Sequence, residues 1–215
     1  MVELAIALGV EDARRVRMDT TVSGTAIHFP TDSGLLWDSV RVLTRNAARI
    51  LEEIPQLPER LFNRTRAARR RMPEIHRLTR SERQSLQGPK YRALITLTTQ
   101  VLTNVRAVAK AARAGAPQLE CEVALRVGAL CDESRHDAGL GEQVVAQAQR
   151  RVLEGETVPA GEKLYSIFEP HTDLLKRGKA QKPVEFGHKL FLAETRRGLI
   201  VDSQVLDGNP TDEGT

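Results

Sequence analysis

At 215 residues and a net charge of +4, with 40% hydrophobic and 28% charged side chains, the chain has the composition of a folded globular protein and not of a disordered tail. Its length suits one large domain, or one domain that carries a big insertion. The longest apolar run is far shorter than the roughly 20 residues that cross a bilayer, and no basic region precedes the apolar stretch at Met1–Val10, so we expect a cytoplasmic protein with no membrane partner.

The first three quarters of the chain predict one strand and then a block of helices. Within residues 13–29, Val16, Met18 and the segment 20–22 alternate or are β-branched, which is typical of a strand. The turn sequence at 31–34 could cap the helix that follows. Several helical segments follow, and in the first and third of them apolar residues recur at helical spacing. These segments lie at residues 35–50, 60–83, 81 or 90 to 114, 118–128 and 141–153.

After Gly161 the apolar spacing changes from helical to strand-like. Short β-rich runs occupy residues 164–168, 184–193 and 199–205, and Arg196–Gly198 suits a hairpin between the last two. A single strand at the start cannot stand alone, so it must pair with these later strands. The expected fold class is therefore α+β, with a sheet made of the first strand and the C-terminal strands and interrupted by a long helical insertion. The corresponding parts of the chain are residues 1–34, 35–160 and 161–215.

Asp19 is the first candidate for chemistry, because it lies in the middle of an apolar and β-branched strand. A carboxylate there is costly unless it is paired or bound to a cation, and a rigid strand suits a metal ligand. The alternative is that Asp19 points to solvent, since half of the side chains of a strand can face water.

The residues around Asp19 belong to longer motifs. Arg17–Val22 reads Arg-Met-Asp-Thr-Thr-Val, and Ile27–Asp38 reads Ile-His-Phe-Pro-Thr-Asp-Ser-Gly-Leu-Leu-Trp-Asp. Further motif segments lie at residues 167–173, 176–179, 184–189 and 207–212. In this order they resemble a family of DDE-type bacterial insertion-sequence transposases, the ISNCY type. The resemblance runs from Arg17 to Asp212, is specific at both ends and is weak through the helical middle.

The resemblance implies an RNase H-like catalytic domain in which Asp19 is the first catalytic and metal-binding acid. Strand transfer in such enzymes uses two divalent metals about 4 Å apart, held by carboxylates, so Mg²⁺ or Mn²⁺ is the expected cofactor. The family's second aspartate and its glutamate follow the Gly-Asn-Pro turn, which here is Gly208–Pro210. We therefore expect a truncated copy with an incomplete site that does not bind metal tightly.

Four other motif residues have a functional and a structural interpretation. Asp32 and Asp38 could be metal ligands, but helix capping and the start of the helix account for both. His28 and His188 could touch phosphate or a catalytic carboxylate. Because no second ligand stands at metal spacing, a structural hydrogen-bonding role is the favoured alternative for the histidines.

The positive charge is concentrated in the helical block. Residues 41–113 hold 17 Lys and Arg against 5 Asp and Glu, whereas the rest of the chain is net acidic. This asymmetry favours DNA binding over the alternative, a solvated helix face on which Glu74 and Glu82 pair with neighbours. The candidate DNA-binding residues are Arg64, Arg66, Arg69, Arg70, Arg71, Arg77 and Arg80, with a second cluster at Lys176, Arg177 and Lys179.

Three functional hypotheses follow from the residues and the resemblance. The first is a transposase, a DNA-cleaving and strand-transferring enzyme, present as a truncated copy. The second is a non-catalytic DNA-binding or regulatory fragment that binds transposon DNA or the full-length transposase. The third is a relic of a decayed element. The expected partners are double-stranded DNA at transposon ends and a second copy of the chain or the full-length enzyme.

Overall fold

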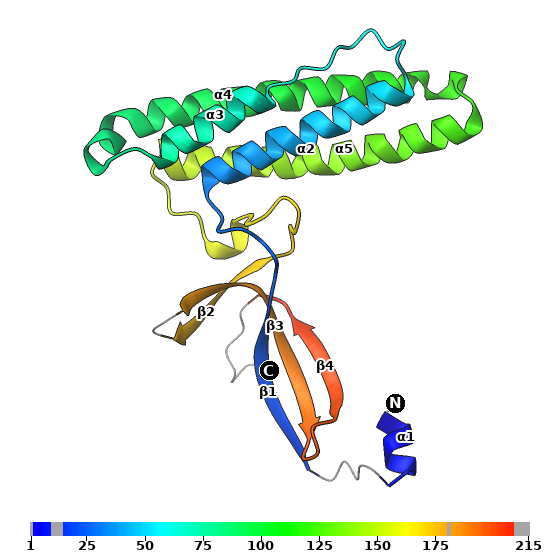
Figure 1. Ribbon diagram of the computed structural model, residues 1–215, viewed down its shortest axis with the longest axis vertical. Helices are drawn as coiled ribbons and strands as arrows, with labels where there is room; N and C mark the ends of the chain where they lie inside the picture. The colour runs from blue at the N-terminus through cyan, green and yellow to red at the C-terminus, as the bar shows by residue number, and fades with distance from the viewer. Residues whose placement is uncertain (1, 10–14, 180–181, 209–215) are drawn as a thin grey trace. The chain divides into compact units, whose positions relative to one another are not determined.

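The computed structural model describes residues 2–9, 15–179 and 182–208, and it divides the chain into two compact units (Figure 1). The sheet unit is formed by residues 1–28 and 171–215. The helical unit is formed by residues 29–170. The chain therefore mixes α and β structure, as expected from its pattern, and the helical unit is inserted between the first strand and the later ones.

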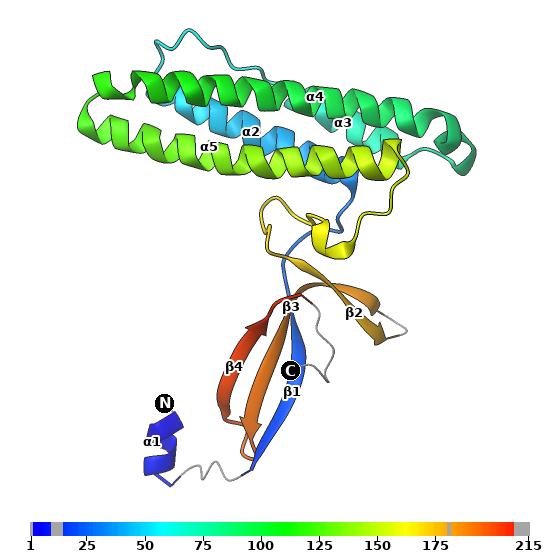
Figure 2. The same ribbon diagram turned by 180° about the vertical axis from the view of Figure 1, so that it is seen from behind.

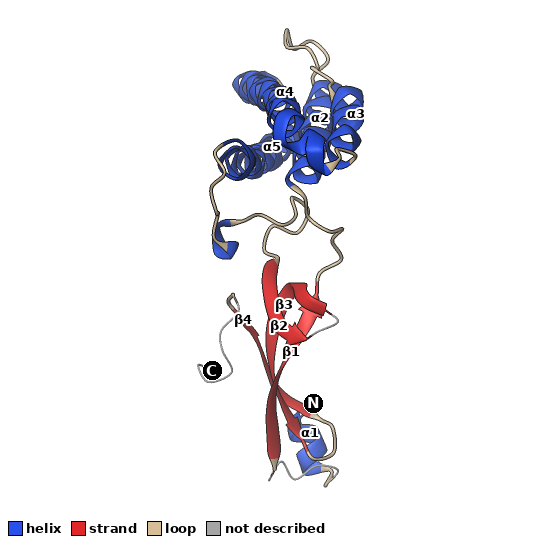
Figure 3. Cartoon of the chain, turned by 90° about the vertical axis from the view of Figure 1, so that its left-hand side faces the viewer, coloured by secondary structure: helices blue, strands red, loops and turns tan. Residues whose placement is uncertain are grey.

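Four α-helices make up the bundle of the helical unit. They are α2 (Asp32–Glu53), α3 (Thr65–His76), α4 (Arg80–Gly115) and α5 (Cys121–Ala148). The long helices α2, α4 and α5 pack on one another, and the shorter α3 packs on α2 and α4 (Figures 2 and 3). Short turns of 3-10 helix at Ala116–Gln118 and Ala160–Glu162 and a π-helical turn at Gln149–Leu153 complete this unit.

The helix starts follow from local capping. The Thr31 side chain accepts a hydrogen bond from Gly34 N at 3.1 Å and so caps α2. Thr79 and Glu82 form a reciprocal capping box at the start of α4. The hydrogen bond from the Thr79 backbone lowers the pKa of Glu82, so this cap is present at neutral pH and is lost as the pH falls through that lowered pKa.

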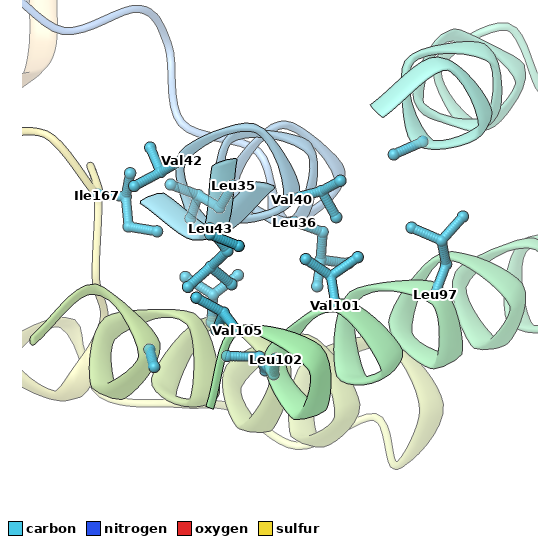
Figure 4. Close-up of a cluster of buried hydrophobic side chains, with 14 of the residues drawn as sticks. Leu35, Leu36, Val40, Val42, Leu43, Leu97, Val101, Leu102, Val105 and Ile167 are labelled. Atoms are coloured by element: carbon cyan, nitrogen blue, oxygen red, sulfur yellow. The ribbon is translucent and has the colours of Figure 1, made fainter. Parts of the chain in front are cut away.

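The core of the helical unit is a continuous apolar cluster between the long helices. Leu36, Val40 and Leu43 of α2 face Val101 and Val105 of α4, and all five side chains are at most 2% exposed (Figure 4). Such complete burial stabilises each side chain by about 1.5–3 kcal/mol relative to leaving it in water. The spacing of these residues, three or four apart, is the helical period that predicted α2 and α4.

The sheet unit is a four-stranded antiparallel sheet built around one long strand. The strands are β1 (Val16–Gly24), β2 (Asp173–Lys179), β3 (Lys182–Thr195) and β4 (Ile200–Leu206). β1 pairs with one edge of β3, while β2 and β4 pair with successive parts of its other edge (Figure 1). A short helix, α1 (Val2–Ala7), precedes β1.

The expected pairing of the first strand with a late strand is confirmed, since Asp19 lies opposite Leu192 in the register. The hairpin expected at Arg196–Gly198 is also present: Thr195 N donates to Leu199 O at 2.8 Å, and Gly198 takes a positive φ of 86°. The strand expected at residues 164–168 is wrong. Leu164 N donates instead to the side chain of Gln147 at 2.9 Å, and Leu164 and Ile167 join the helical core.

Gly187, in the motif segment at residues 184–189, lies where β1 leaves no room for a side chain on β3. A Cβ on Gly187 would lie 2.0 Å from Ser23 O and 2.9 Å from Gly24 Cα, so the strands would have to separate. We expect Gly187→Ala to destabilise the sheet unit by about 1–3 kcal/mol. The measurement is hydrogen exchange of the β1 and β3 amides, which should become faster.

Gly24→Ala is the matched control, because Gly24 lies opposite Gly187 and a Cβ there meets only Phe186 O at 3.8 Å. Its exchange rates should stay close to those of the unmodified chain. Equal acceleration in both variants would mean that close strand approach is not the reason for Gly187.

Among the helices of the described residues, none is both long and apolar enough to cross a membrane.

Candidate functional site

Asp19 lies in the middle of β1 as expected, but its carboxylate faces solvent. Its side chain is 64% exposed, Oδ2 forms an ion pair with Arg17 Nη2 at 3.0 Å, and Oδ1 accepts a hydrogen bond from Thr20 N at 2.8 Å. The local pairing with Arg17 is the arrangement of a surface acid. Such an exposed pair contributes at most about 1 kcal/mol to stability.

The acids of the described residues do not form the ligand set that a two-metal site requires. No group of three or more His, Cys, Asp or Glu side chains able to hold a metal ion occurs within residues 2–9, 15–179 and 182–208. Asp19 on its own could supply one oxygen to Mg²⁺, which prefers six such ligands and retains several waters. Asp212, at the far end of the motif, lies outside the described residues.

The motif histidines belong to the sheet unit. His188 follows Gly187 on β3, and its ring stacks on that of His171 with 5.0 Å between centroids and 9° between planes. Its Nε2 is buried and has no hydrogen-bond partner in the described part of the chain. His28 is exposed. The stacking supports a packing role for His188 at the point where β2, β3 and β1 meet.

The motif acids Asp32 and Asp38 are both buried in the helical unit, and Asp32 joins two of its elements. Asp32 is buried, and Arg151 Nη1 donates to both of its oxygens at 2.8 and 2.9 Å. Gln147 Nε2 donates to the same carboxylate at 3.1 Å, so the start of α2 is tied to the end of α5. Asp38 is buried and accepts from Arg41 at 3.0 Å, one turn along α2.

A polar cluster beside Asp32 joins three helices and was not predicted. Ser33 Oγ lies 2.8 Å from His76 Nε2 at the end of α3, and Tyr91 of α4 lies at the same cavity as Ser33. Burial raises the pKa of Tyr91, so its hydroxyl stays protonated at neutral pH. These residues border a cavity of about 240 Å³ that Arg83 and Gln87 also line. Because Ser33 itself is fully buried, the cluster fastens α3 and α4 to the start of α2.

Sequence reasoning could not find this cluster. Ser33 and His76 are 43 residues apart, and no local spacing relates them. His76 carried no motif of its own. Only the antiparallel return of α3 along α2 brings the two side chains together.

The candidate DNA-binding arginines lie on and beside α3. The inner face of α3 presents the buried residues Ala68 and Ile75, which leaves the remaining faces to charged side chains. Arg64 precedes the helix and stacks over the Phe62 ring at 4.1 Å. We call the following set the arginine segment. It consists of Arg64, Arg66, Arg69, Arg70, Arg71, Arg77 and Arg80, all exposed except the half-buried Arg71.

The arginine segment keeps its positive charge. Within the described ranges, no ion pair reaches any of its seven members. The two acids that could neutralise it are engaged elsewhere: Glu74 pairs with Lys90 at 3.1 Å, and Glu82 caps α4 through Thr79. Glu74 and Glu82 therefore do not neutralise these arginines, and a solvated helix face stays the alternative to DNA binding.

The second basic cluster is only partly described. Lys176 lies on β2 with an exposed side chain. Arg177 and Lys179 belong to β2 by their backbone, and their side chains lie outside the described residues. This cluster is in the sheet unit, whereas the arginine segment is in the helical unit.

The chain matches no known protein-family model, no curated protein and no solved structure.

Proposed function

We propose that the chain binds double-stranded DNA through the arginine segment, and that it is the DNA-binding part of a DDE-type insertion-sequence transposase. The observation that carries the proposal is that seven arginines gather at α3 while the neighbouring glutamates pair with other residues. Unneutralised positive charge in one place is the surface that a polyanion requires.

The geometry of α3 suits a run of phosphates. Arg69 and Arg70 follow Arg66 by three and four residues, so both lie on the same side of the helix as Arg66. Arg77 returns to that face after three turns, and at 1.5 Å per residue the row extends over about 16 Å. DNA carries one negative charge per roughly 1.7 Å of its axis, so several phosphates lie within this length. Contacts of this kind bind DNA with little sequence preference.

Strand cleavage by this chain is supported by one observation, the place of Asp19 on β1. Asp19 is held on a paired strand, beside β3, as the transposase resemblance requires of the first acid. Its ion pair with Arg17 and its exposure favour the second hypothesis, a non-catalytic DNA-binding or regulatory protein. We therefore place DNA binding first and strand cleavage second.

Gel retardation of a DNA duplex over a range of salt concentrations tests the proposal. We expect retardation at low salt and a logarithmic salt slope of roughly −4 or steeper, since at least about four phosphates would be neutralised. No retardation at any salt concentration would refute DNA binding.

A parallel nicking assay with Mg²⁺ or Mn²⁺ separates the two hypotheses. We expect no cleavage above the level of an Asp19→Ala control. Cleavage that disappears in Asp19→Ala would instead establish the chain as an active strand-cutting enzyme.

A further inference from the structure

A cavity of about 270 Å³ lies between the C-terminal half of α4 and the N-terminal half of α5, within the helical unit. Its volume is far above the roughly 10–15 Å³ that one water needs. Four basic side chains line it: Arg106, Lys110 and Arg113 from α4, and Arg135 from α5. The three residues of α4 are spaced as i, i+4 and i+7, which places them on one face of the helix.

The charge at this cavity is not balanced. Arg113 and Arg135 share one carboxylate, Asp132, at 2.5 and 3.3 Å, and Arg106 pairs with Glu142. Lys110 has no ion pair within the described residues. Four cations against two carboxylates leave two positive charges, which equals the charge of a phosphate dianion.

Ser134 supplies a neutral donor at the same place. It lines the cavity, is 1% exposed, and its Oγ is buried without a hydrogen-bond partner in the described part of the chain. A serine or threonine inside a helix usually donates to the carbonyl four residues before it. Ser39 and Thr98 of this unit do so, at 2.8 and 2.9 Å. The unused Ser134 hydroxyl is costly to bury unless a group in the cavity, a water or a ligand, accepts its hydrogen bond.

Cys131, which also lines the cavity, does not oppose an anion. Burial raises the pKa of its thiol, so the group stays neutral at physiological pH. Its Sγ lies 3.5 Å from Ala109 O. The lining therefore combines four cations, a hydroxyl and a neutral thiol, with apolar walls from Val105 and Ala109.

We infer that this cavity binds a phosphate group. Lys110 and the Ser134 hydroxyl are its principal ligands, and the three arginines add positive charge around it. Forked guanidinium groups and ammonium groups bind phosphate oxygens through charge-assisted hydrogen bonds. The group could belong to a free phosphate or to the backbone of DNA.

None of the seven members of the arginine segment lines the cavity. The C-terminal end of α3, where Glu74 pairs with Lys90, is 20 residues of α4 from Lys110, or about 30 Å at 1.5 Å per residue. The other end of the segment is nearer, because Phe62, over which Arg64 stacks, donates to Asn104, six residues before Lys110. The inference for free phosphate does not depend on DNA binding. Only the DNA source rests on the proposed function.

Calorimetric titration of the full chain with inorganic phosphate, at ionic strength held constant with sodium chloride, tests the inference. We expect saturable binding, weakened about tenfold by Lys110→Gln and by Ser134→Ala. Arg92→Ala is the matched control, since Arg92 is an exposed cation of α4 that does not line the cavity. It should change the affinity by less than about twofold.

The same variants in the duplex retardation assay identify the source of the phosphate group. If inorganic phosphate does not bind, but Lys110→Gln and Ser134→Ala weaken retardation and Arg92→Ala does not, the group is a backbone phosphate of DNA. Two results overturn the inference: no phosphate titration together with unchanged retardation, or equal weakening by all three variants. Reversal of the charge at Arg69, Arg70 and Arg71 should leave the affinity for inorganic phosphate unchanged. The phosphate site and the DNA-binding arginine segment can therefore fail their tests separately.

Discussion

Reversing Arg69, Arg70 and Arg71 to glutamate is expected to reduce the affinity of the chain for duplex DNA by at least about 100-fold at moderate salt. The phosphate contacts of Arg69 and Arg70 would be replaced by like-charge repulsions, and the reversal at Arg71 adds a third negative charge beside them, so the logarithmic salt slope should fall by about two or more. Arg69 and Arg70 are exposed and Arg71 is half-buried, so the fold should tolerate the change. The measurement is gel retardation of one duplex at several salt concentrations.

The matched control replaces the same three arginines with lysine. The positive charge is retained, so most of the affinity should remain if binding is Coulombic, while the forked guanidinium contacts are lost. Circular dichroism should show the same helix content in both variants. If the reversal leaves retardation unchanged, DNA contacts a part of the chain other than α3.

Asp32→Ala is expected to destabilise the helical unit by about 1.5–3 kcal/mol, the range for hydrogen bonds to charged groups. The Asp32 side chain is 9% exposed and accepts from both Arg151 and Gln147, so its removal leaves two donors without their acceptor. Because Arg151 is 37% exposed, water can partly solvate it, which places the expected loss below that for a fully buried pair. Urea unfolding measures the loss. Trp37 on α2 is the single tryptophan of the chain, so its fluorescence reports this unit.

Glu133→Ala is the control for the buried pair. Glu133 forms an ion pair with Arg49 at 2.8 Å, but the two side chains are 40% and 46% exposed. Its removal should cost at most about 1 kcal/mol. A loss as large as that of Asp32→Ala would show that burial does not distinguish the two pairs. A loss below about 0.5 kcal/mol in Asp32→Ala itself would contradict the structural role of the motif acid.

The elements that were predicted well have strong local patterns. Leu35 to Ile50 and Tyr91 to Val108 repeat apolar residues at helical spacing, and α2 and α4 follow. The prediction was weaker for α5, expected as two helices and found as one from Cys121 to Ala148. The region between them contains Gly139 and the weaker helix formers Asp132, Ser134, His136 and Asp137, so its own propensity for helix is lower than that of the flanking segments. Packing against α2 and α4 keeps it helical.

For the candidate site, too, the sequence predicted the local structure but not the surroundings of each side chain in the folded chain. The pattern around Asp19 correctly indicated a strand and correctly required a late partner, but it could not tell a buried metal ligand from a surface acid. The two faces of a strand look alike in sequence until its neighbours are known. The concentration of arginines between residues 60 and 83 was visible directly, whereas their lack of neutralisation was decided by where Glu74 and Glu82 found partners.

What the sequence determined by itself is local: the helical and strand periods, the capping residues Thr31 and Thr79, and the uneven charge along the chain. What only the tertiary structure decided is which distant residues meet. Asp32 and Arg151 are 119 residues apart, and β1 pairs with a strand that lies beyond the whole helical unit. The physical reason is that periodicity and capping act over a few residues, whereas ion pairs, cavities and strand pairing depend on how complete elements pack.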